Sequence, residues 1–119
     1  MKYQISKIFN FSASHILNGL VADHPCSRLH GHNYAVRFWF AADVLNYAGF
    51  VIDYRDLDTI KNYINNSLDH RHLNDIFEFN PTSENIAKFL YDTFKLQFAQ
   101  LIRVEVSETP FTNAFYAEN

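Results

Sequence analysis

The sequence predicts an α+β fold in which two helices are inserted between the second and third strands of a four-stranded antiparallel sheet. Apolar and polar residues alternate over 3–15 and again over 30–42. A loop rather than a helix separates these stretches, so antiparallel pairing is expected. Apolar residues then recur at helical spacing over 57–68 and 86–94. Alternation returns over 102–107, which supplies a third strand before a short final one.

The composition is typical of one folded domain spanning residues 1–119. The chain is 48 % hydrophobic and 17 % aromatic, which argues against disorder. A net charge of −3 without a basic block gives no indication of nucleic-acid binding, and no run approaches the roughly 20 apolar residues of a membrane span. The single cysteine, and a start at Met1 that does not resemble a signal peptide, predict a protein of the reducing cytoplasm.

The first predicted strand ends on an imidazole. Apolar side chains occupy most odd positions from Tyr3 to Ala13, and His15 is the next residue of this series. Residues 16–29 then contain the dipeptides Asn-Gly and His-Pro, which are typical of a loop. A histidine is therefore expected where the strand meets the loop.

The second predicted strand begins with two more histidines. His30 and His32 are two residues apart, so a strand places both imidazoles on one face. Antiparallel pairing brings His15 beside them. Three imidazoles are the ligand set of an open zinc site, which leaves a fourth position for water or substrate. Cys26 is an alternative fourth ligand that would close the site into a structural centre, and the spacing does not decide between the two.

Cys26 has two further interpretations. Free cysteine is commonly a small buried residue. A cysteine can also transfer protons, if a nearby cation or histidine lowers the pKa of its thiol. Its place in a polar loop beside the predicted metal site favours the second interpretation.

Both predicted helices have recognisable starts. Asp53 can cap the first helix, and Thr82 can cap the second, which has Glu84 in its first turn. The expected buried positions are Leu57, Ile60, Ile64 and Leu68 in the first helix and Ile86, Phe89, Leu90 and Phe94 in the second.

An exit loop over 68–74 follows the first helix and contains Asp69 and His70. The two residues can form a simple helix-end pair, because a helix C-terminus favours positive charge. Alternatively, Asp69 orients His70 and raises its basicity, as carboxylates do for catalytic imidazoles. We interpret His24 and His72 as surface residues.

The third predicted strand carries a carboxylate on its apolar face. Ile102, Val104 and Val106 alternate with polar residues, and Glu108 is next on the same face. Such breaks in a pattern are often functional. Glu108 can be salt-bridged to a neighbour, or it can anchor a ligand whose planar, guanidine-like edge donates two parallel N–H bonds to the carboxylate.

Six segments of the chain together resemble the 6-pyruvoyltetrahydropterin synthase/QueD family, over essentially the whole length. Each segment alone is a weak signal, but six in family order at family separations are specific. The three residues between the cysteine and the His-Gly-His segment make the 6-carboxytetrahydropterin synthase branch the more similar one. The segments are FSASH at 11–15, CSRLHGH at 26–32, GFVIDY at 49–54, LDH with LN at 68–74, PTSEN at 81–85 and ET at 108–109.

The resemblance implies a tunnelling fold (T-fold), in which sheets of several subunits close into a barrel, usually as a hexamer of two trimers with active sites between subunits. It implies a zinc-dependent lyase that converts 7,8-dihydroneopterin triphosphate to 6-carboxy-5,6,7,8-tetrahydropterin, acetaldehyde and triphosphate in queuosine biosynthesis. The alternatives are a pyruvoyl-forming lyase acting on the same or a related pterin, or a non-catalytic module with a structural zinc ion.

The resemblance also implies roles for individual residues. Zn²⁺ would polarise hydroxyls of the substrate and make the adjacent carbon-bound protons easier to remove. Ile16 departs from the family, which usually has a basic residue there, and Pro110 departs from the small residues of the final turn. The zinc ligands would be His15, His30 and His32, the proton-transfer residues Cys26, Asp69 and His70, and the pterin-binding residue Glu108.

Overall fold

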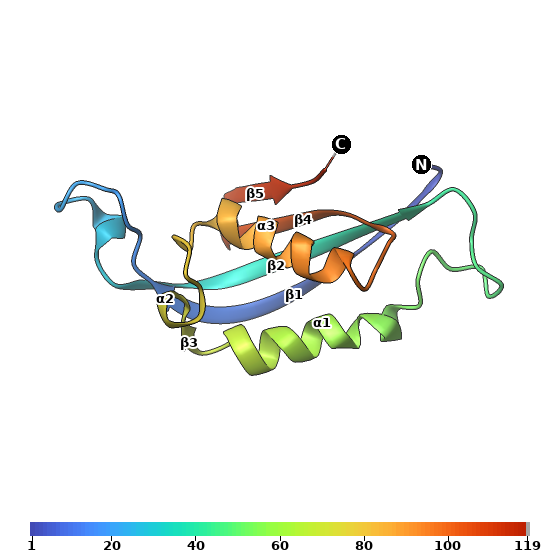
Figure 1. Ribbon diagram of the computed structural model, residues 1–119, viewed down its shortest axis with the longest axis horizontal. Coiled ribbons are helices and arrows are strands. Elements are labelled where there is room, and N and C mark those ends of the chain that lie inside the picture. Colours follow the sequence, from blue (N-terminus) through green and yellow to red (C-terminus); the bar gives the residue numbers. More distant parts are fainter. Residues whose placement is uncertain (119) are drawn as a thin grey trace.

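A five-stranded sheet runs through the molecule, which the computed structural model describes over residues 1–118. The strand order is β3-β1-β2-β4-β5 (Figure 1). Three neighbouring pairs are antiparallel, whereas β3 lies parallel to β1. The strands are β1 (Tyr3–His15), β2 (His30–Ala42), β3 (Arg71–His72), β4 (Leu101–Thr109) and β5 (Thr112–Tyr116).

The α+β class is confirmed, but the predicted four-stranded, purely antiparallel sheet is wrong. The extra strand, β3, comes from the segment predicted as an exit loop, and it pairs with β1 over only two residues. The edge of β1 carries backbone groups that need partners, and the returning chain supplies some of them. One such bond runs from the His70 N–H to the carbonyl of Ser12.

The pairing of β1 with β2 follows the prediction without interruption. It runs from Tyr3 opposite Ala42 to His15 opposite His30. The odd side chains of β1 and the even side chains of β2 therefore share one face, which is the buried one. This register decides where the histidines lie.

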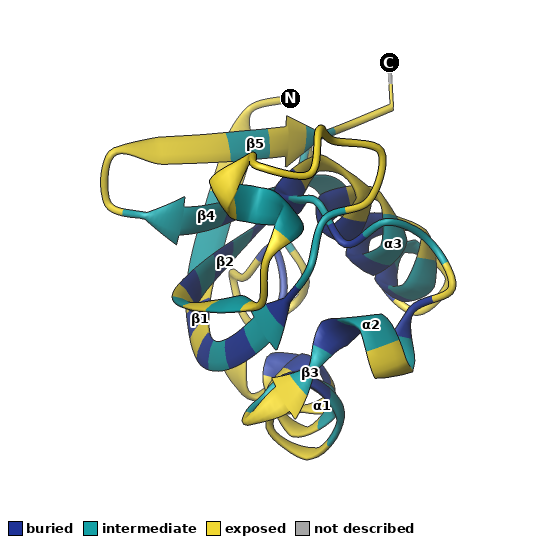
Figure 2. Cartoon of the chain, turned by 90° about the vertical axis from the view of Figure 1, so that its left-hand side faces the viewer, coloured by how far each residue is buried: buried dark blue, intermediate teal, exposed yellow. Residues whose placement is uncertain are grey.

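The helical segments cover that face, as the end-on view shows (Figure 2). The first predicted helix consists of a 3₁₀ turn (Tyr54–Leu57), α1 (Asp58–Tyr63) and a π-helical turn (Ile64–Leu68). Asp53 caps its start through a hydrogen bond from the Arg55 N–H. The second predicted helix is α3 (Ser83–Lys95), capped by Thr82. A four-residue helix that was not predicted, α2 (Leu73–Ile76), makes the number of α-helices in the described part of the chain three rather than two.

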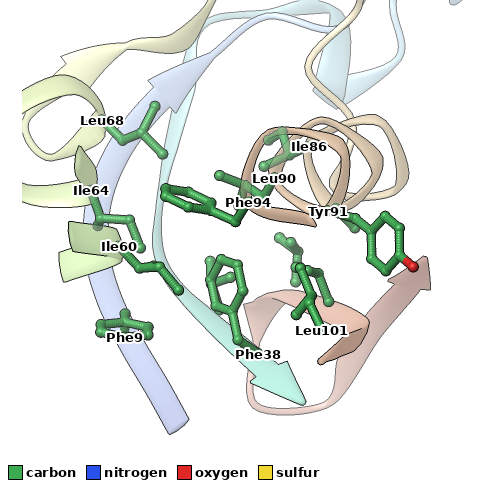
Figure 3. Packing of buried hydrophobic residues seen from close by; sticks show 14 of the residues in the cluster. Phe9, Phe38, Ile60, Ile64, Leu68, Ile86, Leu90, Tyr91, Phe94 and Leu101 are labelled. Atoms are coloured by element: carbon green, nitrogen blue, oxygen red, sulfur yellow. The ribbon is translucent and has the colours of Figure 1, made fainter. Parts of the chain in front are cut away.

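The core lies between the helices and the sheet (Figure 3). Phe38 of β2 is fully buried, and its ring packs edge-on against Phe9 and Phe94 at centroid distances of 5.8 and 5.7 Å. Seven of the eight predicted helix positions are buried, and Phe89 is half-buried. The two layers are thus joined by apolar contact along most of their length.

One core position was predicted wrongly in β4. Leu101 is fully buried, whereas Ile102 is only half-buried. The pairing of β2 with β4 shifts at this point, since Trp39 is opposite Arg103 while Phe40 is opposite Leu101. The bulge inserts one residue and moves Ile102 off the buried face.

The molecule is elongated, with extents of 55 × 28 × 25 Å. The β1–β2 loop, α2 and β3 gather at one end, and the loop that follows β2 lies at the other (Figure 1). Every residue singled out for chemistry except Glu108 belongs to the first end or to a strand terminus there, and β4 brings Glu108 to it. Within residues 1–118, the helices are too short and too polar for one of them to cross a membrane.

Candidate metal centre

Three histidines meet where β1 ends and β2 begins. His15 and His30 are directly paired, and His32 lies two residues further along β2. Their ring centroids are 4.4 to 5.2 Å apart, and one nitrogen of each lies within 4.8 Å of the others. His15 is fully buried, and the other two are half-buried. The group could hold a metal ion.

Backbone carbonyls orient two of the imidazoles. Nδ1 of His15 is 2.8 Å from the carbonyl oxygen of Pro81, and Nδ1 of His30 is 2.8 Å from that of Arg28. A carbonyl oxygen only accepts, so both Nδ1 atoms carry the proton and both Nε2 atoms keep their lone pair. This is the usual arrangement of metal-binding histidines.

Among residues 1–118, the buried Nε2 atom of His30 has no hydrogen-bond partner. A buried, unsatisfied nitrogen is costly unless another group binds it. The donor set of three neutral imidazoles suits Zn²⁺, so the residues present fit the ion that the sequence predicts.

Glu108 adds a carboxylate to this group of three histidines. Its Oε2 is 3.3 Å from Nε2 of His15 and 3.2 Å from Nε2 of His32. The close approach of His15 is the main reason why the pKa of Glu108 lies below its usual value, and burial is the main reason why the pKa of His32 is lowered. A carboxylate oxygen facing a nitrogen lone pair is repulsive, so a cation or proton near them is favoured.

Two hydroxyls lie in the surroundings of the histidines. The Tyr34 hydroxyl is 3.2 Å from Nδ1 of His15, and burial raises the pKa of this phenol. Ser83, the first residue of α3, is buried, and its Oγ has no hydrogen-bond partner within residues 1–118. Neither residue was singled out from the sequence.

Two asparagines fix the loop that follows His15. The side chain of Asn74 accepts from the N–H of Ile16 and donates to its carbonyl, both at 2.8 Å. Asn80 binds the backbone of Asn18 in the same way, at 2.9 and 3.1 Å. Each side-chain amide thus forms the pair of hydrogen bonds, one to an N–H and one to a carbonyl, that a neighbouring strand would form. These contacts span 58 and 62 residues of sequence, so no local pattern indicates them.

Cys26 lies in a 3₁₀ turn (Pro25–Ser27) of the same loop. Its thiol is free and half-buried, and its N–H donates to Nδ1 of the exposed His24. Within the described chain, the group of close metal-ligand atoms contains the three histidines without Cys26. The closed structural centre with a cysteine ligand therefore receives no support from the geometry of this chain.

The backbone around Asp69 and His70 is unusual. The π-helical turn closes with a bond from the Asp69 N–H to the carbonyl of Ile64, and His70 adopts a positive φ of 60°. Oδ1 of Asp69 accepts from the Ser12 N–H at 2.9 Å, and Oδ2 is 2.9 Å from Nδ1 of His70. π-Turns and left-handed non-glycine residues often occur at functional sites.

The same contacts orient His70 for proton transfer. Asp69 holds the Nδ1 proton, so Nε2 of this imidazole is left to accept one. The hydrogen bond from Ser12, followed by that from His70, lowers the pKa of Asp69 below its usual value. The carboxylate is therefore charged at neutral pH.

His70 does not belong to the group of three close histidines of its own chain. Its side chain is 82 % exposed and lines a groove of about 510 Å³ with Ser12, Ser14 and Asn33, which lie on the face of β1 and β2 that the helices leave open. His72, interpreted as a surface residue, is half-buried and bonded through Nδ1 to Ser14 Oγ at 2.9 Å.

Comparisons with known proteins agree with the fold described above. The family model described as 6-pyruvoyl tetrahydropterin synthase matches residues 4–119. The 6-carboxy-5,6,7,8-tetrahydropterin synthase of Bacillus subtilis is 31 % identical, covering 96 % of this chain and 84 % of its own, and that of Synechocystis sp. is 37 % identical, covering 94 % and 91 %. The structure of Caenorhabditis elegans 6-pyruvoyl tetrahydropterin synthase superposes with a TM-score of 0.85 at 25 % identity, over 98 % of this chain and 96 % of that one.

Proposed function

The chain belongs to the 6-pyruvoyl tetrahydropterin synthase family, and we propose that it is a zinc-dependent 6-carboxy-5,6,7,8-tetrahydropterin synthase. The observation that carries the proposal is the group of three histidines with its buried, unpartnered Nε2 on His30. Two relatives above 30 % identity bear this name.

The proposed reaction converts 7,8-dihydroneopterin triphosphate and water to 6-carboxytetrahydropterin, acetaldehyde and triphosphate, which balances without a redox cofactor. Its product would enter queuosine biosynthesis, and the free thiol fits an enzyme of the reducing cytoplasm. His15, His30 and His32 would hold Zn²⁺, which as a Lewis acid makes carbon-bound protons beside the substrate hydroxyls more acidic.

Cys26 and the Asp69–His70 pair are the proposed proton-transfer groups. His70 presents Nε2 as a base while Asp69 fixes its tautomer. Because His70 opens onto the face of the sheet opposite the histidines, we propose that it serves the substrate held by another copy of this chain. The enzyme would then be a homo-oligomer, and a hexamer built as a dimer of trimers is the expected form.

Glu108 is the proposed pterin-binding residue. Its Oε2 faces two histidines, and its side chain is 28 % exposed, so the second oxygen can still accept from a planar N–H edge. The pterin ring of the substrate would thus be held beside the metal centre, and the side chain of the pterin would lie over the histidines.

The second candidate is a lyase that forms the 6-pyruvoyl product from the same or a related pterin. The likeness to the structure of C. elegans 6-pyruvoyl tetrahydropterin synthase favours it. The two candidates differ in their products, since only the carboxy-forming reaction releases acetaldehyde.

The test is an assay of the purified, zinc-loaded protein with 7,8-dihydroneopterin triphosphate. We expect acetaldehyde and a product with the mass of 6-carboxytetrahydropterin. The His70→Ala variant is the matched control, because it should keep zinc and lose turnover. A pyruvoyl product identifies the second candidate, and a zinc-loaded protein that consumes no pterin refutes both.

A further inference from the structure

Apart from His70 itself, the residues of the groove beside His70 have no role in the proton transfers described above. Its polar side chains come from β1, β2 and the β3 segment, and it is separate from the apolar core. The side chains that carry the argument are Ser12, Ser14, Asn33, His70, Arg71 and His72.

Asn33 provides uncommitted hydrogen-bond donors in this groove. The Ser12 hydroxyl donates to Oδ1 of Asn33 at 2.7 Å, which leaves both N–H groups of that amide available. Asp69 holds the Nδ1 proton of His70, so Nε2 of that ring is an acceptor and is not among the donors, whereas His72 bonds through Nδ1 to Ser14 and its Nε2 remains available. Such a set suits an oxygen-rich ligand.

Arg71 supplies a positive charge at the groove. Its guanidinium donates to the neutral carbonyl of Asn66 at 3.0 Å, and it forms no ion pair within residues 1–118. The nearest acid in sequence, Asp69, has each oxygen occupied, by the Ser12 N–H and by His70. The groove is therefore suited to an anion.

The chemistry of the proposed substrate places its phosphates close to His70. The two hydroxyl-bearing carbons that undergo proton transfer are followed by a single carbon, which carries the triphosphate. A base that reaches those carbons must therefore lie beside the triphosphate. This holds whether the base comes from the protein chain that holds the substrate or from another copy.

We propose that this groove is the polyphosphate subsite of the enzyme, with Arg71 and the amide of Asn33 as its principal phosphate contacts. The inference rests on the proposed function, and it adds how the substrate's charged end is recognised. A guanidinium and an amide can bind phosphate oxygens through several N–H bonds at once.

The test is a calorimetric titration of the full-length, zinc-loaded protein with inorganic tripolyphosphate, with zinc content measured before and after. Arg71→Gln should weaken binding about tenfold, the typical effect of losing one charged hydrogen bond. Arg55→Gln is the matched control, because Arg55 is an exposed arginine whose salt bridge is to Asp53. It should bind like the wild type.

A second variant, Asn33→Asp, keeps the side-chain shape and adds a negative charge to the groove. It should weaken binding at least as much as Arg71→Gln, and added salt should reduce the wild-type affinity. In the enzyme assay, Arg71→Gln should raise KM about tenfold and change kcat little, because Arg71 lies away from the reacting carbons.

The outcomes separate the two proposals. If both groove variants bind tripolyphosphate like the wild type, or if tripolyphosphate only strips zinc equally from all variants, the subsite is refuted while acetaldehyde release still supports the function. If the variants lose binding but no pterin is consumed, the groove is a polyphosphate site and the proposed reaction is wrong.

Discussion

His15 and His30 face each other as directly paired residues of β1 and β2, with ring centroids 4.4 Å apart. Each Nδ1 atom is held by a backbone carbonyl 2.8 Å away. The two rings are thus fixed by the strand register and by two carbonyl groups. A metal centre built in this way is oriented before any ion binds.

His30→Ala should abolish stoichiometric zinc binding. We expect the affinity to fall by more than about 100-fold, since even losing an outer hydrogen bond commonly costs 10- to 100-fold. Atomic absorption of dialysed protein measures the bound metal. His70→Ala should retain a full complement, and equal zinc loss in both variants would contradict the assignment of the ligands.

Cys26→Ala should leave zinc in place and remove most turnover, because the thiol is proposed to carry protons and not to bind the ion. Metal content and acetaldehyde release from one preparation measure both effects. Loss of zinc and of the folded state in this variant would instead support a structural centre with a cysteine ligand.

Asn74→Ala should destabilise the fold by about 1–3 kcal/mol, because it leaves the backbone of Ile16 without two part-buried hydrogen bonds. Urea unfolding followed by circular dichroism measures the change. Asn65→Ala is the control, since Asn65 is an exposed residue of the π-helical turn. An equal effect of both substitutions would argue against the clamp.

The Asp69 carboxylate should make stability depend on pH. Its folded pKa lies below the usual value of 3.8, mainly through the hydrogen bond from Ser12, so its contribution is fully present above about pH 4 and is lost as the pH falls through the folded pKa. Asp69→Asn should therefore lower the unfolding midpoint at pH 7, and the difference from wild type should shrink towards pH 2.

Asp75→Asn is the control for this pH series, because Asp75 is exposed and close in sequence. Its difference from the wild type should stay small throughout. A gap between Asp69→Asn and the wild type that remains constant from pH 7 to pH 2 would show that the charge of Asp69 does not contribute.

Phe38→Ala should cost about 3–5 kcal/mol, because it removes a fully buried ring that contacts Phe9 and Phe94 between the sheet and α3. Phe111→Ala is the matched control, because that ring is 93 % exposed in the β4–β5 turn. Thermal or urea unfolding distinguishes the two. Similar costs would mean that the core does not lie where the structure places it.

The strands and helices were predicted well where the periodicity of apolar residues continued without interruption. The bounds of β2 and the caps Asp53 and Thr82 are confirmed. The predictions failed at two places: the bulge in β4, where one residue is inserted, and β3, where the chain returns to the edge of β1. The bulge beside Trp39 displaced Ile102, and the short β3 is formed only because the edge of β1 was available.

The alternation of residues along β1 and β2 was sufficient to bring His15, His30 and His32 together, because strand period and antiparallel pairing are local rules of the backbone. Only the tertiary structure decided what surrounds them. Glu108 reaches the imidazoles from β4, and His70 opens onto the other face of the sheet. Those relationships join residues far apart in the sequence. They depend on how the helices and the sheet pack, and the hydrophobic periodicity of the sequence does not specify that packing.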